Sequence, residues 1–428
     1  MRVLLASFAE RSHFQVTVPL VWALRSAGHE VLVATQPQLV DDAAGAGLPV
    51  VAVGSDHTLY RALDRLARLS DGATSQTPSD SIGMDPARLD EFEWSDWLDF
   101  YRFNVGLWWR LINDPILGDL VTLCRQWRPD LVLWEALTFS GAVAAQATGV
   151  PHVRLLFGSD LLVPARRRFL RLAAAQPPER RADPLRAWLD SCARRHGTEF
   201  SEELITGLAT VGYLPRPLRL AGTSCLPARY VPYNGRSVVP GWIRERPPRP
   251  RVGVTTGISA VTGSGRRTSP VQRILAGLAD LDVEVVATIT EPARADLGPV
   301  PDNVRLTSFV PLDALAATCS AVVNHGGAAT MCTVLRHGVP QLVVPATTYD
   351  EGVLAGLLAR TGAGSTLDPA DATPTAVRQA VSALLHDPAV ASAARHLADQ
   401  ARAMPTPADL VPRLERLLLR PRPTRVRG

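Results

Sequence analysis

The sequence predicts an α/β protein built from two Rossmann-like units, each a parallel sheet flanked by helices. Short apolar runs of the length typical of buried strands alternate with helical segments in both halves of the chain. Such alternation indicates parallel strands joined by crossover helices. With 428 residues, 46% of them hydrophobic, the chain can bury more than one core, so two domains are expected.

The first half of the chain begins with a predicted strand over residues 2–7, a loop over 8–14 and a helix over 16–27 that ends at Gly28. Its further elements are a strand over 30–34, a strand over 131–134, a helix over 139–148 and a strand over 152–157. Residues 1–213 are therefore predicted to form an N-terminal domain.

Residues 214–250 are rich in proline and arginine, which predicts an extended connection between two domains. After it the strand pattern resumes, with strands expected at 251–255, 283–288, 304–306, 321–323 and 342–344. Residues 251–428 are predicted to form the C-terminal domain, whose last helix is a candidate to cross back to the N-terminal domain.

Charge and composition exclude several classes of function. A net charge of +4 is too small to indicate a nucleic-acid partner, and no apolar run reaches membrane-spanning length. The five cysteines show no CxxC spacing, so neither a disulfide framework nor a zinc site is indicated. No signal-peptide core and no NAD or ATP fingerprint occurs, so we expect a cytoplasmic protein without a tightly bound cofactor.

Residues 324–330, with the sequence NHGGAAT, are the most informative stretch of the chain. Glycines let backbone approach a ligand closely, and a helix expected to begin near Ala328 would present unpaired amides that favour phosphate. The residues predicted to hold a diphosphate are His325, Gly326, Gly327, Ala329 and Thr330. A bare HGG taken alone is equally compatible with an ordinary glycine-rich turn that carries a capping threonine.

Asp350 and Glu351 follow the predicted strand over 342–344 and a proline, at the carboxyl end of that strand. Open α/β sheets bind ligands at this edge, and carboxylates are good acceptors for sugar hydroxyls. We therefore expect the pair to bind a sugar beside the diphosphate. Their combined charge would favour a cationic aminosugar, whereas the alternative is a solvated acidic pair.

His13 lies just beyond the first predicted strand, and Glu135 directly follows the strand over 131–134. Both positions are at the carboxyl edge of the sheet, where a neutral imidazole could take a proton from a hydroxyl. Glu135 could bond the far ring nitrogen and orient it, so the two form a candidate catalytic pair. In isolation His13 would be read as an exposed loop residue or a helix cap.

Aromatic residues are concentrated between residues 92 and 109, in a chain that is only 6% aromatic. They could line a pocket for a large flat or macrocyclic acceptor, bury a partner protein, or pack in the core of a helical excursion. The candidate acceptor-binding residues are Trp94, Trp97, Phe100 and Phe157.

The series of strand, HGG, helix, GVPQ strand and acidic loop resembles the nucleotide-sugar signature of GT-B glycosyltransferases related to UDP-glucuronosyltransferases. The resemblance implies two Rossmann-like domains facing across a cleft, with His13 and Glu135 as a catalytic dyad. It further implies nucleotide contacts from Gly257, Ile258, Ser259, Phe309 and Val310. Glu351 stands where that family has Gln, and Glu135 where its members often have Asp.

Residues 151–160 (PHVRLLFGSD) and 229–235 (RYVPYNG) carry a narrower resemblance, to actinobacterial antibiotic deoxysugar transferases. Within these, the chain is similar to the macrolide and anthracycline group that needs a cytochrome-P450-like auxiliary protein. This implies a TDP-deoxysugar donor, often an aminodeoxyhexose, a hydrophobic polyketide acceptor and an inverting, metal-independent transfer.

Two other functions stay open at the level of sequence. A hydrolysing nucleotide-sugar epimerase shares the expected fold and nucleotide site but needs no acceptor, and a non-catalytic binding protein needs no base. The sequence does not determine the aglycone, the sugar or the oligomeric state, for which a homodimer is one candidate.

Overall fold

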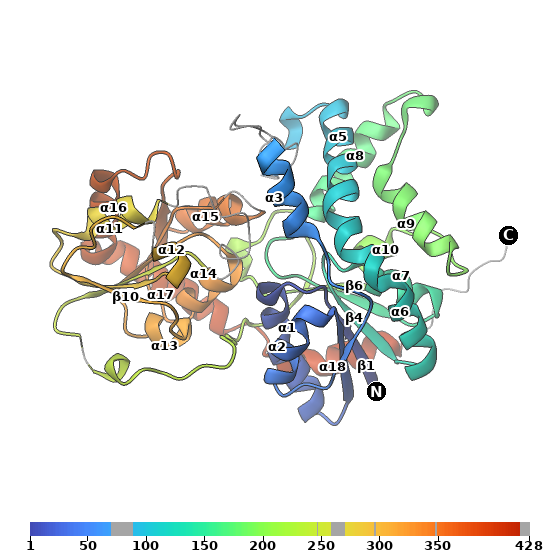
Figure 1. Ribbon diagram of the computed structural model, residues 1–428, viewed down its shortest axis with the longest axis horizontal. Helices are drawn as coiled ribbons and strands as arrows, with labels where there is room; N and C mark the ends of the chain where they lie inside the picture. The colour runs from blue at the N-terminus through green and yellow to red at the C-terminus, as the bar shows by residue number, and fades with distance from the viewer. Residues whose placement is uncertain (70–88, 246, 258–269, 295–296, 347–348, 420–428) are drawn as a thin grey trace.

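The computed structural model describes residues 1–69, 89–245, 247–257, 270–294, 297–346 and 349–419. The described chain forms two α/β domains, each built on its own parallel sheet with helices on both faces (Figure 1). Together they form the predicted pair of Rossmann-like units. Within the described residues, no helix combines the length and the apolar character needed to span a membrane.

The first sheet has seven parallel strands in the order β3-β2-β1-β4-β5-β6-β7. Its strands are β1 (Arg2–Ala6), β2 (Glu30–Thr35), β3 (Val50–Ala52), β4 (Leu131–Glu135), β5 (His152–Leu155), β6 (Ala209–Gly212) and β7 (Leu226–Pro227). Strand order reverses at β1, which pairs with β2 on one side and β4 on the other. The carboxyl ends of β1 and β4 therefore lie side by side, at the switch point where such sheets bind ligands.

Alternating residues of β1 and β4 point to opposite faces of this sheet and enter two separate cores. One face is covered by α1 (Arg11–Ser26), α2 (Val40–Gly45) and the last helix of the chain. The other face and its outer layer carry α3 (Leu59–Leu69), α5 (Trp94–Phe103), α6 (Arg110–Trp127), α7 (Phe139–Ala147), α8 (Leu162–Ala174), α9 (Pro184–Arg194) and α10 (Glu203–Thr206).

The second sheet has six parallel strands in the order β10-β9-β8-β11-β12-β13. Its strands are β8 (Arg251–Thr255), β9 (Glu284–Thr288), β10 (Val304–Thr307), β11 (Ala321–Asn324), β12 (Gln341–Val343) and β13 (Gly364–Thr366). The helices of this half are α11 (Val271–Leu278), α12 (Glu291–Arg294), α13 (Leu312–Ala316), α14 (Ala328–Leu335), α15 (Glu351–Arg360), α16 (Pro374–His386) and α17 (Pro388–Arg402). Here β8 and β11 are the central neighbours, so the HGG turn after β11 also lies at a switch point.

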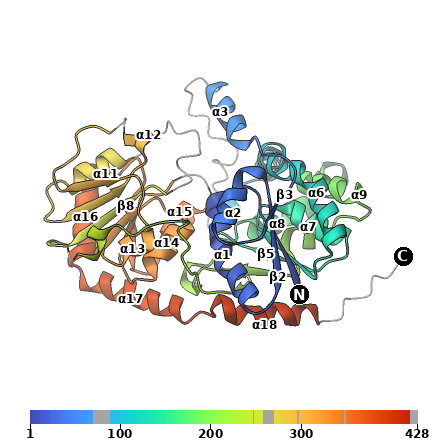
Figure 2. The ribbon, with the colours of Figure 1, turned by 60° about the horizontal axis from the view of Figure 1, so that its bottom comes forward.

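Helix α18 (Pro407–Leu418) leaves the C-terminal domain and packs against α1 of the N-terminal domain. Figure 2 shows α17 and α18, in red, running along one side of both domains. Thr406 begins α18 with a capping box shared with Asp409, and Pro407 occupies the first turn, where its missing N–H costs nothing. The buried face of α18, including Leu414, joins the core beneath β1 and β2.

Two sequence-based boundaries need correction. Helix α1 begins at Arg11, so the loop predicted over residues 8–14 is wrong over its last four positions. The reason is a cap, because the Glu10 side chain accepts a hydrogen bond from Ser12 N and starts the helix early. The first sheet also continues to β7, inside the stretch 214–250 that was predicted to be linker.

Candidate active site

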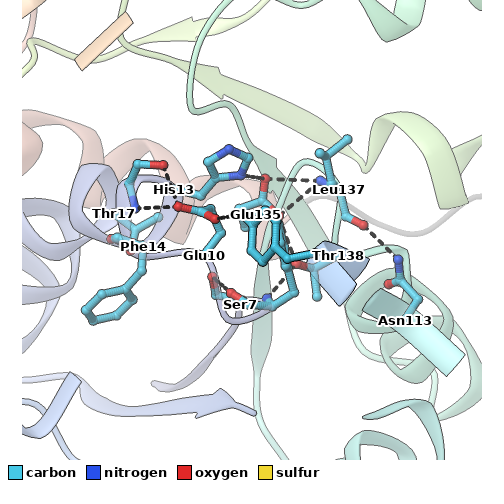
Figure 3. A network of polar contacts seen from close by, with 12 residues as sticks. Ser7, Glu10, His13, Phe14, Thr17, Asn113, Glu135, Leu137 and Thr138 are labelled. Carbon is cyan, nitrogen blue, oxygen red and sulfur yellow. Dashed lines mark hydrogen bonds and ion pairs between the residues drawn. The ribbon is translucent and has the colours of Figure 1, made fainter. Parts of the chain in front are cut away.

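His13 and Glu135 meet at the carboxyl edge of the first sheet, as the sequence analysis expected. His13 lies in the first turn of α1, and its Nδ1 is 3.0 Å from Oε1 of Glu135, the last residue of β4 (Figure 3). A carboxylate has no proton to give, so Nδ1 carries the shared hydrogen. The neutral imidazole then has its lone pair on Nε2, which is the arrangement of a general base.

Glu135 is fully buried and held in one orientation by its neighbours. Its carboxylate accepts hydrogen bonds from Leu137 N, at 3.2 and 3.1 Å to its two oxygens, and from Thr138 Oγ1 at 2.9 Å. These donors offset the loss of water around a buried carboxylate. The pair is therefore an oriented dyad, in which the position of Glu135 is set by the turn that follows β4.

The His13 ring is held between two aromatic side chains. Phe157 stacks on it with ring centroids 3.6 Å apart at 14°, and Phe8 packs edge-on at 5.3 Å. The His13 side chain is 16% exposed, so part of the imidazole is accessible to a substrate. Phe157, predicted from the sequence to contact an acceptor, thus touches the candidate base directly.

A second carboxylate near His13, that of Glu10, was not predicted from the sequence. Glu10 is buried, and it accepts hydrogen bonds from Ser12 and from the hydroxyl of Tyr60. Burial acts to raise the pKa of Glu10, but the charge of His13 and the hydrogen bonds from Tyr60 and Ser12 outweigh it and lower that pKa. The only available signal was its place two residues before a helical Ser, a pattern too common to mark a site.

In the C-terminal domain, His325 is clasped by two glycines. A Cβ at Gly257 would lie 2.3 Å from its Cε1, and a Cβ at Gly327 would lie 2.5 Å from its Nε2. Burial lowers the pKa of His325 to about 4, against a hydrogen bond to the Thr255 backbone that acts to raise it. His325 is therefore neutral at physiological pH and has no positive charge to offer a ligand.

The HGG turn is braced from behind by two side chains that have no direct access to a ligand. Gly326 N donates to Asn324 Oδ1 at 2.9 Å, and Asn324 Nδ2 donates to Gln341 Oε1 at 3.0 Å. Gln341 Nε2 in turn donates to Met331 O in α14. Gly326 has φ of +90°, a conformation that favours glycine, so the turn depends on this residue and on its Asn324 bond.

The other nucleotide-contact predictions are spread along the same edge of the second sheet. Ala329 and Thr330 lie in the first turn of α14, whose amino end points out of the sheet edge at the HGG turn. Phe309 is 49% exposed after β10, whereas Val310 is buried. Gly257 ends the described part of its loop, and Ile258 and Ser259 lie outside the described residues.

Asp350 and Glu351 begin α15, immediately beside the HGG turn. Glu351 accepts a hydrogen bond from Tyr349 N at 2.7 Å, and its Cβ would lie 3.0 Å from a Cβ added at Gly326. Burial, followed by the charge of Glu351, raises the pKa of Asp350 to about 7. The pair therefore carries less than two full charges near neutral pH, which weakens the attraction for a cation expected from the sequence.

The acceptor role predicted for Trp97 and Phe100 is wrong for this conformation. Both side chains are fully buried in the core where α5 packs against α8 and α9, so neither has surface to offer a ligand. Trp94 is partly buried and packs on Phe169 with ring centroids 5.0 Å apart. The aromatic segment is thus largely core packing, the alternative that the sequence could not separate from a pocket.

A small cavity lies where the two domains meet. It is lined by residues of both domains, among them Phe157, Gly158, Tyr213, Tyr230, Ala328 and Ala329. It therefore lies between the His13 dyad, through Phe157, and the amino end of α14. Among the described residues, no group of three or more His, Cys, Asp or Glu side chains is arranged to hold a metal ion.

Comparison with known proteins places this geometry among glycosyltransferases. The chain is 46% identical to 10-deoxymethynolide desosaminyltransferase of Streptomyces venezuelae, over 97% of both chains. It is 43% identical to tylactone mycaminosyltransferase of Streptomyces fradiae, over 97% of this chain and 92% of that one. Its fold matches the crystal structure of the glycosyltransferase VinC in complex with DTDP, with a TM-score of 0.84, 37% identity and coverage of 98% and 100%.

Family models match the same two units that the structure shows. Residues 22–257 match the N-terminal domain of erythromycin biosynthesis protein CIII-like proteins, and residues 272–417 match their C-terminal domain. The first match alone spans more than half of the chain. The predicted GT-B architecture is confirmed, and the chain belongs to the erythromycin biosynthesis protein CIII-like family of glycosyltransferases.

Proposed function

We propose that this protein transfers a deoxysugar from a TDP-sugar to a hydroxyl of a polyketide-type aglycone in antibiotic biosynthesis. The observation that carries the proposal is the oriented His13–Glu135 dyad. Phe157, which stacks on His13, lines a small cavity together with Ala328 and Ala329 at the amino end of α14. The close relatives are named for desosaminyl and mycaminosyl transfer to macrolide precursors, and one matched structure holds DTDP. This supports a TDP-deoxysugar donor, with an aminodeoxyhexose as the first candidate.

The reaction follows from the dyad. His13 Nε2 takes the proton of the acceptor hydroxyl as that oxygen attacks the anomeric carbon from the face opposite the diphosphate. The Nδ1–H bond to Glu135 stabilises the imidazolium that forms. One displacement forms the glycosidic bond and breaks the bond to the diphosphate, so the configuration at the anomeric carbon inverts.

The departing diphosphate receives hydrogen bonds from the amides at the amino end of α14 and from the Thr330 hydroxyl, beside the neutral His325 ring. Such fixed donors stabilise the charge that develops on the leaving group without requiring a metal ion. His325 Nδ1 is buried and has no hydrogen-bond partner among the described residues, which supports a role in binding a ligand. Asp350 and Glu351 would accept hydrogen bonds from hydroxyls of the donor sugar.

Two further expectations belong to the proposal. A cytochrome-P450-like auxiliary protein would dock on the N-terminal domain and activate transfer, and the enzyme would act as a monomer or a homodimer. Activity measured with and without a co-purified auxiliary protein, together with the mass of the particle in solution, checks both.

The first test is calorimetric titration with TDP and with UDP, in the absence and presence of Mg²⁺. We expect metal-independent binding with a preference for TDP. If neither nucleotide bound, the HGG turn would lose its assigned role in binding the diphosphate.

The second test replaces His13 by Ala in an assay with a TDP-deoxysugar and a macrolide precursor as acceptor. Turnover should fall by about a thousandfold or more, because a general base contributes about 10²–10⁴ and the ring also positions the acceptor. TDP affinity should stay within about twofold, since the nucleotide site is on the other domain. Undiminished turnover would contradict the base, and sugar release without acceptor would point to a hydrolase.

A further inference from the structure

The loop after β5 touches both halves of the candidate site in consecutive residues. Phe157 stacks on His13, and its ring centroid lies 5.1 Å from that of Tyr349 in the C-terminal domain. Two residues later, Ser159 N donates a hydrogen bond to Asp350 Oδ2 at 2.6 Å. The candidate base and the candidate sugar-binding carboxylate are therefore joined through three neighbouring residues.

Gly158, between these two contacts, allows the domains to approach. A Cβ at this position would lie 2.4 Å from Asp350 Oδ2 and 3.3 Å from the Ala328 Cβ at the start of α14. A separation below 3.0 Å forces a shift, and here the obstruction belongs to the opposite domain. The backbone angle of Gly158 lies outside the left-handed region, so close approach, not conformational freedom, is what demands glycine.

We propose that Gly158 and Ser159 are positioning residues that hold Asp350 across the domain interface. The carboxylate expected to bind the donor sugar then also holds the two domains in their closed arrangement. This role rests on the proposed function, because it assigns the donor sugar to Asp350. The β5–α8 loop would then set the position of the donor sugar relative to the catalytic base.

The chemistry of a carboxylate permits both roles at once. Asp350 has two oxygens, and Ser159 N occupies Oδ2, which leaves Oδ1 to accept a sugar hydroxyl. Asp350 is only 4% exposed, so its surroundings hold the carboxylate in place. A sugar bonded to it would lie at a set distance from Phe157, and therefore from the His13 ring stacked on Phe157.

The test compares Gly158→Ala with Gly352→Ala, a matched control. Gly352 is in α15, two residues after Asp350, and a Cβ there meets nothing within 4 Å. With TDP-deoxysugar and acceptor, we expect Gly158→Ala to lose about tenfold or more in kcat, since a displacement of about 1 Å can cost about a hundredfold. TDP affinity should fall much less than kcat, because the added Cβ clashes with Asp350 at 2.4 Å but approaches Ala328, at the start of α14, only to 3.3 Å. Gly352→Ala should match the wild type in both.

A kcat for Gly158→Ala equal to that of the control would overturn the positioning role. A variant that lost kcat and TDP affinity together would also contradict it, because that result indicates general disruption of the fold. If the wild type transferred no sugar, the proposed function would fail, whereas the contact could still be tested without turnover.

That separate test is small-angle X-ray scattering of the three free proteins. The free wild type has the Ser159–Asp350 contact, so Gly158→Ala should show a larger radius of gyration than the wild type and Gly352→Ala. Three equal radii would exclude a part for Gly158 in domain closure, whatever reaction the protein catalyses.

Discussion

Asp350 combines burial, a neighbouring carboxylate and a bond across the two domains in one side chain. Burial first and the charge of Glu351 second raise its pKa from 3.8 to about 7. The folded protein therefore keeps a proton that the unfolded chain releases at lower pH. The contribution of Asp350 to stability should fall as pH rises between these two values, and stay level above and below them.

Replacing Asp350 by Asn removes this titration. Between about pH 4 and 7, wild-type stability should decline relative to Asp350→Asn by up to about 1.4 kcal/mol per pH unit. Urea unfolding at several pH values measures the difference, with equal slopes of free energy against denaturant as the check that both proteins unfold alike. Parallel pH profiles for the two proteins would show that the carboxyl is ionised in the fold.

At the scale of the element, the turn between β11 and α14 depends on small residues more than on any single polar contact. Gly257 and Gly327 clasp His325 from two sides, and Gly326 adopts a left-handed conformation. Asn324 and Gln341 brace the turn from behind. The small residues of this turn therefore fix the position of the His325 ring next to the amino end of α14.

Replacing Gly327 by Ala tests this role of the small residues. The backbone of Gly327, with φ of −59°, suits alanine, but the added Cβ would lie 2.5 Å from His325 Nε2 and push the ring away. We expect TDP affinity to fall about tenfold or more, which corresponds to about 1.4 kcal/mol. Gly118→Ala, in α6 with nothing within 4 Å, is the control for a harmless added methyl. Equal affinities for both variants would argue against a role for His325 in binding.

At the scale of the whole molecule, the described joints between the two domains include the connection before β8, the loop after β5, and helix α18. The buried face of helix α18 belongs to the hydrophobic core of the other domain. The C-terminal end of the chain thus contributes to the stability of the N-terminal domain.

Leu414→Ala should show this contribution. Leu414 is fully buried against the first sheet, and its truncation should cost about 2–5 kcal/mol of stability by loss of apolar burial and cavity formation. Arg416→Ala, an exposed neighbour on the same helix, should change stability by less than about 0.5 kcal/mol. Thermal or urea denaturation measures both, and an unchanged Leu414→Ala would mean that α18 detaches in solution.

The features of this protein that depend on local pattern could be predicted from the order of its residues. Runs such as 131–134 and 321–323 are apolar over the length of one buried strand, and each is followed at once by its polar site residue. Because parallel strands end at a common edge, the encounter of His13 with Glu135 could be expected, and the structure contains it. The HGG turn could also be predicted, because its strand, its glycines and the start of its helix are contiguous in the sequence.

Features that depend on contacts between distant segments could be seen only in the folded structure. Trp97 and Phe100 are residue types that often line a ligand pocket, and only the packing of α5 against α8 and α9 buries them completely. The pairing of Ser159 with Asp350 spans 191 residues and two domains, and its donor is a backbone N–H that every residue except proline carries. Residue types therefore indicated which chemistry is present, whereas the closeness of the domains determined which groups face each other.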